Sequence, residues 1–469
     1  MLIRRHVASA CLALSGALAC GDPGYDSSDP EVPEAVVTGV QIDPSATHQT
    51  LEGFGAALAW YQGTLASHPL KQEIYELAFA ELGLDILRFR NRYQRTDTRD
   101  RDLGPELEIL GAATASLGHA PIVLLTSWSP PGAIKANGLE DCGAAANCTL
   151  RRDGAGFVYA DFASYWYDSL VDYAAQGLAV DYVSIQNEPN FIPDWEGCKL
   201  TPSETADYAG YDRALAEVAG RLASLPDAPR LLGPEVLGIH WNALQEYVAR
   251  MDVDLVYGLA HHLYELGSDE VWNWRYPGPA SYLAPMRSAA AASRGKPLFQ
   301  TEFQTDADNG TEGGFETAWL IHESLVDEGV AAFLYWDLVW SGAGLVSLDG
   351  PSYHLRDQYY SLRHYARFTD PGWVRVDAVT DATDLLASAY VSPDRRELTV
   401  VILNVGETDR TPAIDLGGFT AATSRVYRTV YRPGASETWV DLGSLADVGS
   451  VLVLPSRSVC TVVVTSEAP

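Results

Sequence analysis

Short apolar runs alternate with helix-like stretches from about residue 50 to residue 340. Stretches such as KQEIYELAFAEL (71–82), FASYWYDSLVDYAAQ (162–176) and TAWLIHESLVDEG (317–329) repeat apolar residues at helical spacing. Eight strands alternating with helices predict a (β/α)8 TIM barrel within residues 51–368. A doubly wound sheet is the alternative, but GFG at 53–55 lacks the GxGxxG spacing of its phosphate-binding turn. The eight apolar runs are LEGFGAALAW (51–60), LDILRFRN (84–91), PIVLLTSWS (121–129), VDYVSIQNE (180–188), RLLGPEV (230–236), LVYGLAHHLY (255–264), PLFQTEF (297–303) and VAAFLYWDLVW (330–340).

The pattern changes after residue 370, where helical spacing nearly disappears. Runs such as LLASAYVS (385–392), ELTVVILNV (397–405) and SVLVLPSRSVCTVVVT (450–465) alternate or stay apolar, with turn residues between them. These runs predict an attached antiparallel β-sandwich over residues 369–469. The run AVVTGVQID (35–43) is also strand-like, so residues 36–50 are expected to add an N-terminal strand to that sandwich.

The first twenty residues have the pattern of an export signal. A basic start is followed by an apolar stretch from Val7 to Leu18 that is too short for a stable membrane anchor. Cys20 ends the sequence Ala-Leu-Ala-Cys, at the position where bacterial lipoproteins carry the lipidated cysteine. The Pro-, Gly- and acid-rich residues 21–35 are expected to form a flexible linker. The sequence therefore predicts an exported bacterial protein, either a cell-surface lipoprotein or a protein released by ordinary signal peptidase.

Export permits disulfides, and four cysteines follow Cys20. Cys142 and Cys148 flank the small-residue loop GAAAN and could close it. Cys460 lies in an apolar terminal run and is expected to be a small core residue. With Cys198, three pairings of these four cysteines are open.

Composition and motifs limit what the chain is expected to bind. The net charge is −30, from 62 acidic and 32 basic residues, which argues against nucleic acid or anionic membranes as partners. No CxxC, HExxH or clustered-histidine pattern occurs, and the adjacent His261 and His262 would point to opposite faces of a strand. Neither a metal ion nor a cofactor is expected.

In a barrel, catalytic groups lie at the carboxyl ends of the strands. Glu188 and Glu302 end the fourth and seventh apolar runs, and Pro189 stops the first of these strands directly after Glu188. Two converging carboxylates with aromatic walls are what glycosidic bond cleavage requires. The alternative is that Glu188 and Glu302 each form an ion pair that serves only the stability of the fold. The other residues at strand ends are Trp60, Arg88, Arg90, Trp128, Asn187, Glu235, His262, Tyr264, Trp336 and Trp340.

Several stretches together resemble glycoside hydrolase family 30, which belongs to the clan of retaining (β/α)8 glycosidases. They are LEGFGAALAW, ILRFRNRY, SWSPPGAIKANG, SIQNEPNF, FQTEF, YYSLRHYARFTDPGWVRVDA (359–378) and LPSRSVCTVVV (454–464). The resemblance implies that Glu188 is the acid/base, Glu302 the nucleophile and Asn187 the amide that binds the sugar 2-hydroxyl. Arg88 would hold the nucleophile ionised, although Arg90 on the same strand face could exchange roles with it. His262 or Tyr264 would donate to the nucleophile, and Trp60, Trp128, Trp336 and Trp340 would form subsite walls.

Within that family the resemblance is closest to the bacterial xylanase branch. Glucuronoxylan-specific members bind the glucuronate branch with an Arg and a Tyr after strand eight, yet the loop at 338–354 offers no Arg, and Tyr353 and Arg356 come late. The expectation is a monomeric, retaining endo-β-1,4-xylanase without strict glucuronate dependence, acting by double displacement on a polysaccharide. The alternatives are a β-1,6-glucanase or galactanase, a glucosylceramidase-type enzyme, and a non-catalytic carbohydrate-binding protein.

The N-terminal pattern makes a direct prediction about the mature protein. Residues 1–19 are removed and Cys20 carries lipid, so mass spectrometry of the native N-terminus finds a diacylglyceryl-modified Cys20. Replacing Cys20 by Ala releases the protein from the membrane fraction. An unacylated N-terminus that begins at another residue contradicts the prediction.

Overall fold

The computed structural model describes residues 39–93, 102–143, 147–154, 156–266, 272–273, 278–305, 310–434, 436–448 and 452–466. The predicted export signal at 1–20, its Cys20 and the linker at 21–35 lie outside the described residues. Within the described chain, no helix is both long and apolar enough to cross a membrane.

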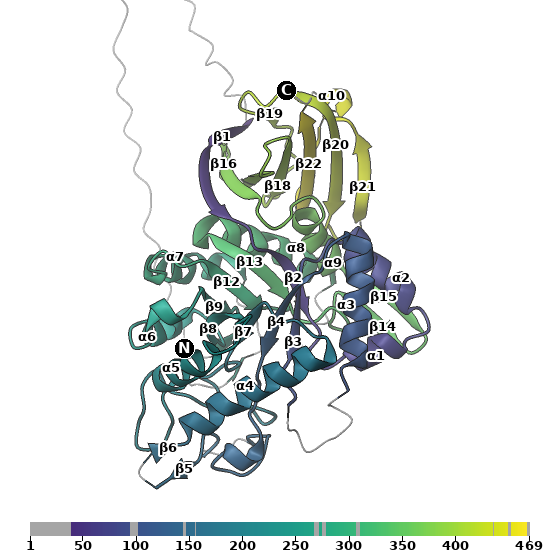
Figure 1. Ribbon diagram of the computed structural model, residues 1–469. Helices are drawn as coiled ribbons and strands as arrows, with labels where there is room; N and C mark the ends of the chain where they lie inside the picture. The colour runs from purple at the N-terminus through teal and green to yellow at the C-terminus, as the bar shows by residue number, and fades with distance from the viewer. Residues whose placement is uncertain are drawn as a thin grey trace, which may run out of the picture. The chain divides into compact units, whose positions relative to one another are not determined.

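Eight parallel strands close into a barrel, which confirms the predicted fold class (Figure 1). Each of the apolar runs recognised in the sequence contains one barrel strand. The interior below the mouth is filled by a small apolar cluster that includes Ile86, Leu124, Tyr182, Leu232 and Phe299. In the order of their pairing, the strands are β12 (Leu298–Glu302), β13 (Val330–Tyr335), β2 (Gly53–Ala57), β3 (Ile86–Arg90), β4 (Ile122–Thr126), β7 (Tyr182–Ser184), β8 (Arg230–Val236) and β9 (Gly258–His262).

Helices cover the outside of the barrel, and the three helical stretches predicted from spacing are among them. Two of these change character along their length, because α2 (Lys71–Tyr75) continues as the π-helix η1 (Glu76–Glu81) and α8 (Gly310–Glu323) continues as the π-helix η8 (Ser324–Glu328). The remaining larger helices are α3 (Gly104–Leu117), α4 (Tyr159–Gln176), α5 (Tyr211–Leu222), α6 (Ala243–Val248), α7 (Leu283–Ala292) and α9 (Asp357–Ala366).

The second domain is one hydrogen-bonded sheet of eight strands whose inner face encloses its own apolar core. The pairings are antiparallel, except that β1 (Gly39–Thr50) runs parallel to β19 (Ala413–Asp415). The N-terminal strand β1 is thus part of this sheet, as the sequence predicts. The other strands are β16 (Val374–Thr380), β17 (Leu385–Val391), β18 (Glu397–Asn404), β22 (Ser458–Ser466), β20 (Ala421–Val430) and β21 (Glu437–Gly443).

A buried histidine joins the two domains. His364 of α9 makes a 2.8 Å hydrogen bond to the hydroxyl of Thr461 in β22 and another of 2.8 Å to that of Thr429 in β20. Burial lowers the pKa of His364 to about 3, so its ring is neutral and can donate from one nitrogen while accepting at the other. The barrel helix and the sheet are therefore connected by a satisfied polar contact inside an apolar boundary.

One predicted strand begins later than its apolar pattern indicates. The run 450–465 reads as continuous, but β22 starts only at Ser458. Pro455 has no backbone N–H and cannot donate to a ladder, and Leu454 makes only an isolated bridge to Arg410.

Candidate active site

Two irregular strands turn glutamates into the mouth of the barrel. Leu232 and Phe299 belong to the interior cluster, so strict alternation along β8 and β12 would point Glu235 and Glu302 outward. The register shifts between Pro234 and Val236 and again between Gln300 and Glu302. Glu235 also adopts a φ of 62°, a conformation that is rare for residues other than glycine. These bulges re-aim both carboxylates toward the barrel axis.

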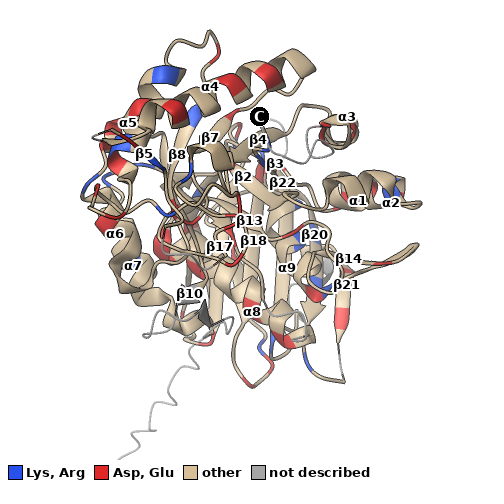
Figure 2. Cartoon of the chain, turned by 90° about the horizontal axis from the view of Figure 1, so that it is seen from below, with Lys and Arg blue, Asp and Glu red and all other residues tan. Residues whose placement is uncertain are grey.

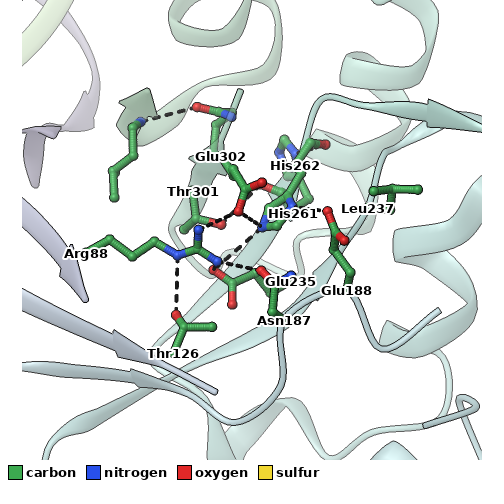
Figure 3. Close-up of polar contacts among 12 residues, drawn as sticks. Arg88, Thr126, Asn187, Glu188, Glu235, Leu237, His261, His262, Thr301 and Glu302 are labelled. Atoms are coloured by element: carbon green, nitrogen blue, oxygen red, sulfur yellow. Dashed lines mark hydrogen bonds and ion pairs between the residues drawn. The ribbon is translucent and has the colours of Figure 1, made fainter. Parts of the chain in front are cut away.

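Arg88 stands at the centre of the polar cluster, between two of the glutamates (Figure 3). Its Nη1 lies 2.5 Å from Oε2 of Glu302, and its Nη2 lies 3.0 Å from Oε1 of Glu235. Nη2 also donates to Oδ1 of Asn187 at 2.7 Å, and Nε donates to the hydroxyl of Thr126 at 3.3 Å. The guanidinium is fully buried, and it therefore holds the nucleophile candidate and the amide in fixed positions.

Charge balance keeps this buried cluster stable. Burial by itself disfavours a charged Glu235, but the positive charge of Arg88, the contact with His262 and a hydrogen bond from Ser184 together outweigh burial and lower the pKa of Glu235 to about 2. In the same way, burial disfavours a charged Arg88, while Glu235 and Glu302 raise its pKa above the ordinary value. The guanidinium therefore lies between two carboxylates and forms an ion pair with each.

His262 supplies the second positive charge and contacts the acid/base candidate. Its Nδ1 lies 3.0 Å from Oε1 of Glu188, and its Nε2 lies 3.7 Å from Glu235 and 3.8 Å from Glu302. Burial lowers the pKa of His262, but the surrounding carboxylates raise it to a net value of about 9. His261, by contrast, points away from the mouth and pairs with the buried Glu328 at 2.7 Å, so the two rings do face opposite ways.

The two predicted catalytic carboxylates differ in their surroundings. Burial is the main cause that raises the pKa of Glu188, and the charge of Glu302 adds to it, although the hydrogen bond from His262 opposes the rise. Glu302 instead makes a direct ion pair with Arg88. A carboxyl group with a raised pKa beside a carboxylate that pairs with an arginine is the arrangement that a glycosidase needs.

The spacing of these carboxylates bears on stereochemistry and on metal binding. One oxygen of Glu188, one of Glu302 and a ring nitrogen of His262 all lie within 4.8 Å of one another. Such closeness matches retaining glycosidases, with carboxyl groups about 5–5.5 Å apart, and not inverting ones at about 6.5–9.5 Å. The same three groups are near enough to share a cation, but Arg88 and protonated His262 already place positive charge there. The donor set does not fit a metal ion.

Aromatic rings form the walls of a cleft of about 430 Å³ above the cluster. Trp60, Trp128 and Trp336 pack against one another, with ring centroids 4.9 to 5.6 Å apart. Trp340 stacks on Tyr61 at 5.6 Å, and Tyr264 lines the cleft beside Glu188 and Glu302. Flat apolar faces around two carboxylates suit the stacking of sugar rings.

A second wall of the cleft comes from two loops held together by a buried lysine and a disulfide. Cys142 and Cys148 form a disulfide, and the Cys142 N–H donates to the carbonyl of Trp195 at 2.8 Å. Lys135 is buried and donates to Ser129 at 3.1 Å and to the Glu140 and Gly197 carbonyls at 2.5 and 2.7 Å. This wall presents Asp141, Trp195 and Glu196 to the cleft.

The structure brings together every residue that the sequence placed at the site. Arg88, rather than Arg90, contacts Glu302; Arg90 instead pairs with Glu196 at 3.0 Å and lies 4.3 Å from the Trp60 ring. Glu235, which the sequence left open, lies in the centre of the cluster. Cys198 and Cys460 are buried free thiols. Sequence reasoning missed Tyr61, Asp141, Trp195, Glu196 and Gln304 in the cleft lining, since none of them ends an apolar run.

Comparison with known proteins gives consistent matches. No protein-family model matches the sequence. The chain is 24% identical over 383 residues to glucuronoxylanase XynC of Bacillus subtilis strain 168, covering 79% of this chain and 78% of that protein. In sequence the chain is thus similar to this glucuronoxylanase, and in fold it is similar to solved structures of glycoside hydrolase family 30.

Solved structures agree with the fold of a family 30 glycoside hydrolase. The catalytic domain of a family 30 xylanase C from Talaromyces cellulolyticus matches with a TM-score of 0.70 and 20% identity, over 91% of this chain and 100% of that chain. A family 30 endoxylanase from Clostridium papyrosolvens C71 matches with a TM-score of 0.66 and 24% identity, again over 91% and 100%. The barrel and the sheet domain are thus both part of the shared fold.

The His262–Glu188 contact predicts how the pH profile of this enzyme responds to mutation. Because the acid must be protonated, activity falls as the pH rises through the pKa of Glu188. The histidine lowers that pKa, so His262→Phe is expected to move the alkaline limb of kcat/KM to higher pH, with kcat reduced roughly 10-fold or more. The matched control, His261→Gln, changes the neighbouring ring that does not touch Glu188, and should leave the limb in place. A limb that moves to lower pH in His262→Phe contradicts the prediction.

Proposed function

We propose that this enzyme is an exported, retaining endo-β-1,4-xylanase that cleaves the xylan backbone without requiring a glucuronate branch. The main observation in support of the catalytic mechanism is that oxygens of Glu188 and Glu302 lie within 4.8 Å of each other. The surroundings of Glu188 raise its pKa, while Glu302 forms an ion pair with Arg88. The match to the Bacillus subtilis protein named glucuronoxylanase supports xylan as the polymer. An aromatic cleft at the open mouth of the barrel supports recognition of a sugar chain.

In the proposed mechanism, the Glu302 carboxylate attacks the anomeric carbon while Glu188 protonates the leaving oxygen. The bond from the anomeric carbon to that oxygen breaks, and a covalent glycosyl-enzyme forms on Glu302. Glu188, now ionised, then takes a proton from water, whose oxygen displaces Glu302 with a second inversion. Arg88 forms an ion pair with Glu302, and Asn187, fixed by Arg88, is the amide proposed to bind the 2-hydroxyl.

The independence from glucuronate rests on the charges around the cleft. Arg356 is buried and donates to the Ala343 carbonyl at 2.7 Å, and Tyr353 donates to Glu73 at 3.2 Å. Among the described residues that line the cleft, Asp141 adds negative charge, Glu196 is paired with Arg90, and none is Lys or Arg. Figure 2 shows Asp and Glu spread over the elements around the barrel, in keeping with the net charge of −30. An anionic branch is not a favourable anchor in such surroundings.

A polysaccharide panel tests the substrate. With a reducing-end assay, neutral arabinoxylan and glucuronoxylan should be cut at comparable rates, releasing oligosaccharides, while β-1,6-glucan, β-1,6-galactan and glucosylceramide are cut little. NMR of the first product should show the β-anomer. Activity restricted to glucuronoxylan contradicts glucuronate independence, and activity on a β-1,6-glucan alone contradicts xylan. An initial α-anomer contradicts a retaining mechanism. If the protein hydrolyses none of these glycans, the remaining alternative is a non-catalytic carbohydrate-binding protein.

The two glutamates should fail differently when each is replaced by alanine. Glu302→Ala loses the nucleophile, so activity disappears on all substrates and azide yields an inverted glycosyl azide. Glu188→Ala loses roughly 10²–10⁴-fold on xylan, but an activated aryl glycoside still glycosylates the enzyme because its leaving group needs little protonation. Azide then restores turnover with retained configuration.

The control is Glu196→Gln, which changes another carboxylate of the same cleft and should alter kcat far less. Near wild-type xylan hydrolysis by Glu188→Ala, together with complete loss in Glu235→Ala, would overturn the assignment of roles.

A further inference from the structure

An exposed tryptophan lies on the loop that follows β8. Trp241 belongs to the short helix η4 (His240–Asn242), and its side chain is 69% exposed, the largest exposed fraction among the large hydrophobic residues of the described chain. The other exposed tryptophan of the described chain, Trp195, lines the cleft. An indole left in water loses the burial that ordinarily stabilises it, so packing does not account for Trp241.

The backbone at this position is strained as well. Trp241 and Asn242 have φ values of 59° and 60°, which a bulky side chain rarely adopts. Neither residue is glycine, so both conformations cost free energy, and the indole of Trp241 is nevertheless exposed. Strained conformations of this kind persist where the surrounding structure fixes them, often at ligand-binding positions.

A shallow hollow of about 320 Å³ lies beside the indole, between η4 and the start of α7. Ile239, Ala284 and Pro285 give it an apolar floor, while Asn242 and Ser288 add an amide and a hydroxyl at its rim. A flat aromatic face flanked by neutral hydrogen-bonding groups matches the chemistry of a sugar ring, which has apolar faces and hydroxyls at its edge. His240 is the one ionisable residue among the described residues of the lining, and its Nε2 contacts the Ser281 carbonyl at 3.2 Å; no Asp, Glu, Lys or Arg is present to favour an ionic ligand.

The segment that leads to Trp241 is hydrogen-bonded through its backbone to the catalytic loops. The Glu188 N–H donates to the Glu235 carbonyl at 3.0 Å, and the Leu237 N–H donates to Oδ1 of Asn190 at 3.0 Å. The Tyr264 N–H, from the cleft lining, donates to the Leu237 carbonyl at 3.1 Å. The segment from Glu235 to Trp241 thus connects the polar cluster of the active site to the exposed indole within seven residues of chain.

We propose that Trp241 and the hollow beside it form a second sugar-binding platform, which holds a distant part of the same polysaccharide chain that is cut in the cleft. The nature of the polymer rests on the proposed function, whereas the platform itself rests on the indole, its strained turn and the hollow. A platform of this kind strengthens binding of long chains and does nothing for substrates that fill only the cleft.

Affinity electrophoresis in gels containing soluble arabinoxylan tests the platform. Glu302→Ala serves as the parent protein, so that the polymer is not digested. Adding Trp241→Ala should weaken retardation by the polymer roughly 3- to 10-fold, the factor expected for loss of one stacking face, while Trp241→Phe keeps most of it. Ala284→Leu, which fills the hollow without touching the strained turn, should weaken retardation in the same way. Binding of a xylotriose by calorimetry should not change in any variant.

Val171→Ala is the matched control, because Val171 is exposed on α4 and lies outside the hollow. Unchanged retardation in both Trp241→Ala and Ala284→Leu overturns the proposal, as does equal weakening for the trisaccharide. A dimer in sedimentation that Trp241→Ala dissociates would assign the surface to a second copy of the chain instead. Retardation by a different polysaccharide, still dependent on Trp241, would keep the platform and overturn xylan as the substrate. A parent that no polysaccharide retards overturns the platform.

Discussion

The buried guanidinium of Arg88 is the interaction on which the rest of the site depends. It forms ion pairs with Glu235 and Glu302 and donates to Asn187, so three strands of the barrel and the loop after a fourth meet at one side chain. A buried charge without partners is costly, and removing one partner of such a pair typically costs about 3–5 kcal/mol. The geometry that aligns the carboxylates is therefore tied to the stability of the barrel mouth.

The same charge arrangement depends on departures from regular strand geometry. Regular alternation would place Glu235 and Glu302 on the outer face, against the helices, where neither could reach Arg88. The register shifts in β8 and β12 interrupt the regular pairing of these strands, and they thereby bring the carboxylates of Glu235 and Glu302 to the barrel axis. His262 then completes the balance, because its protonated ring faces Glu188, Glu235 and Glu302. The charged cluster of the active site therefore depends directly on the irregular backbone of these two strands.

The sequence was sufficient for the parts of the molecule that follow from periodicity. Eight apolar runs became eight barrel strands, and Glu188 and Glu302 were visible because each ends such a run. What alternation cannot reveal is a bulge, so the central place of Glu235 was not predictable, and Arg88 and Arg90 on one strand face were not distinguishable. Trp195 and Glu196 were missed because they lie on a long loop without regular spacing, which is held at the cleft by tertiary contacts such as those with Cys142 and Arg90.

The disulfide-held wall also bears on how the protein is best produced. Cys142 and Cys148 close a small loop, the Cys148 sulfur lies 3.2 Å from the Gly197 carbonyl, and the free thiol of Cys198 follows directly in the chain. During oxidative refolding, a third cysteine next to the correct pair offers a competing partner by thiol exchange. A host that forms disulfides in the compartment where the chain folds should therefore give a more uniform preparation than oxidation after cell lysis.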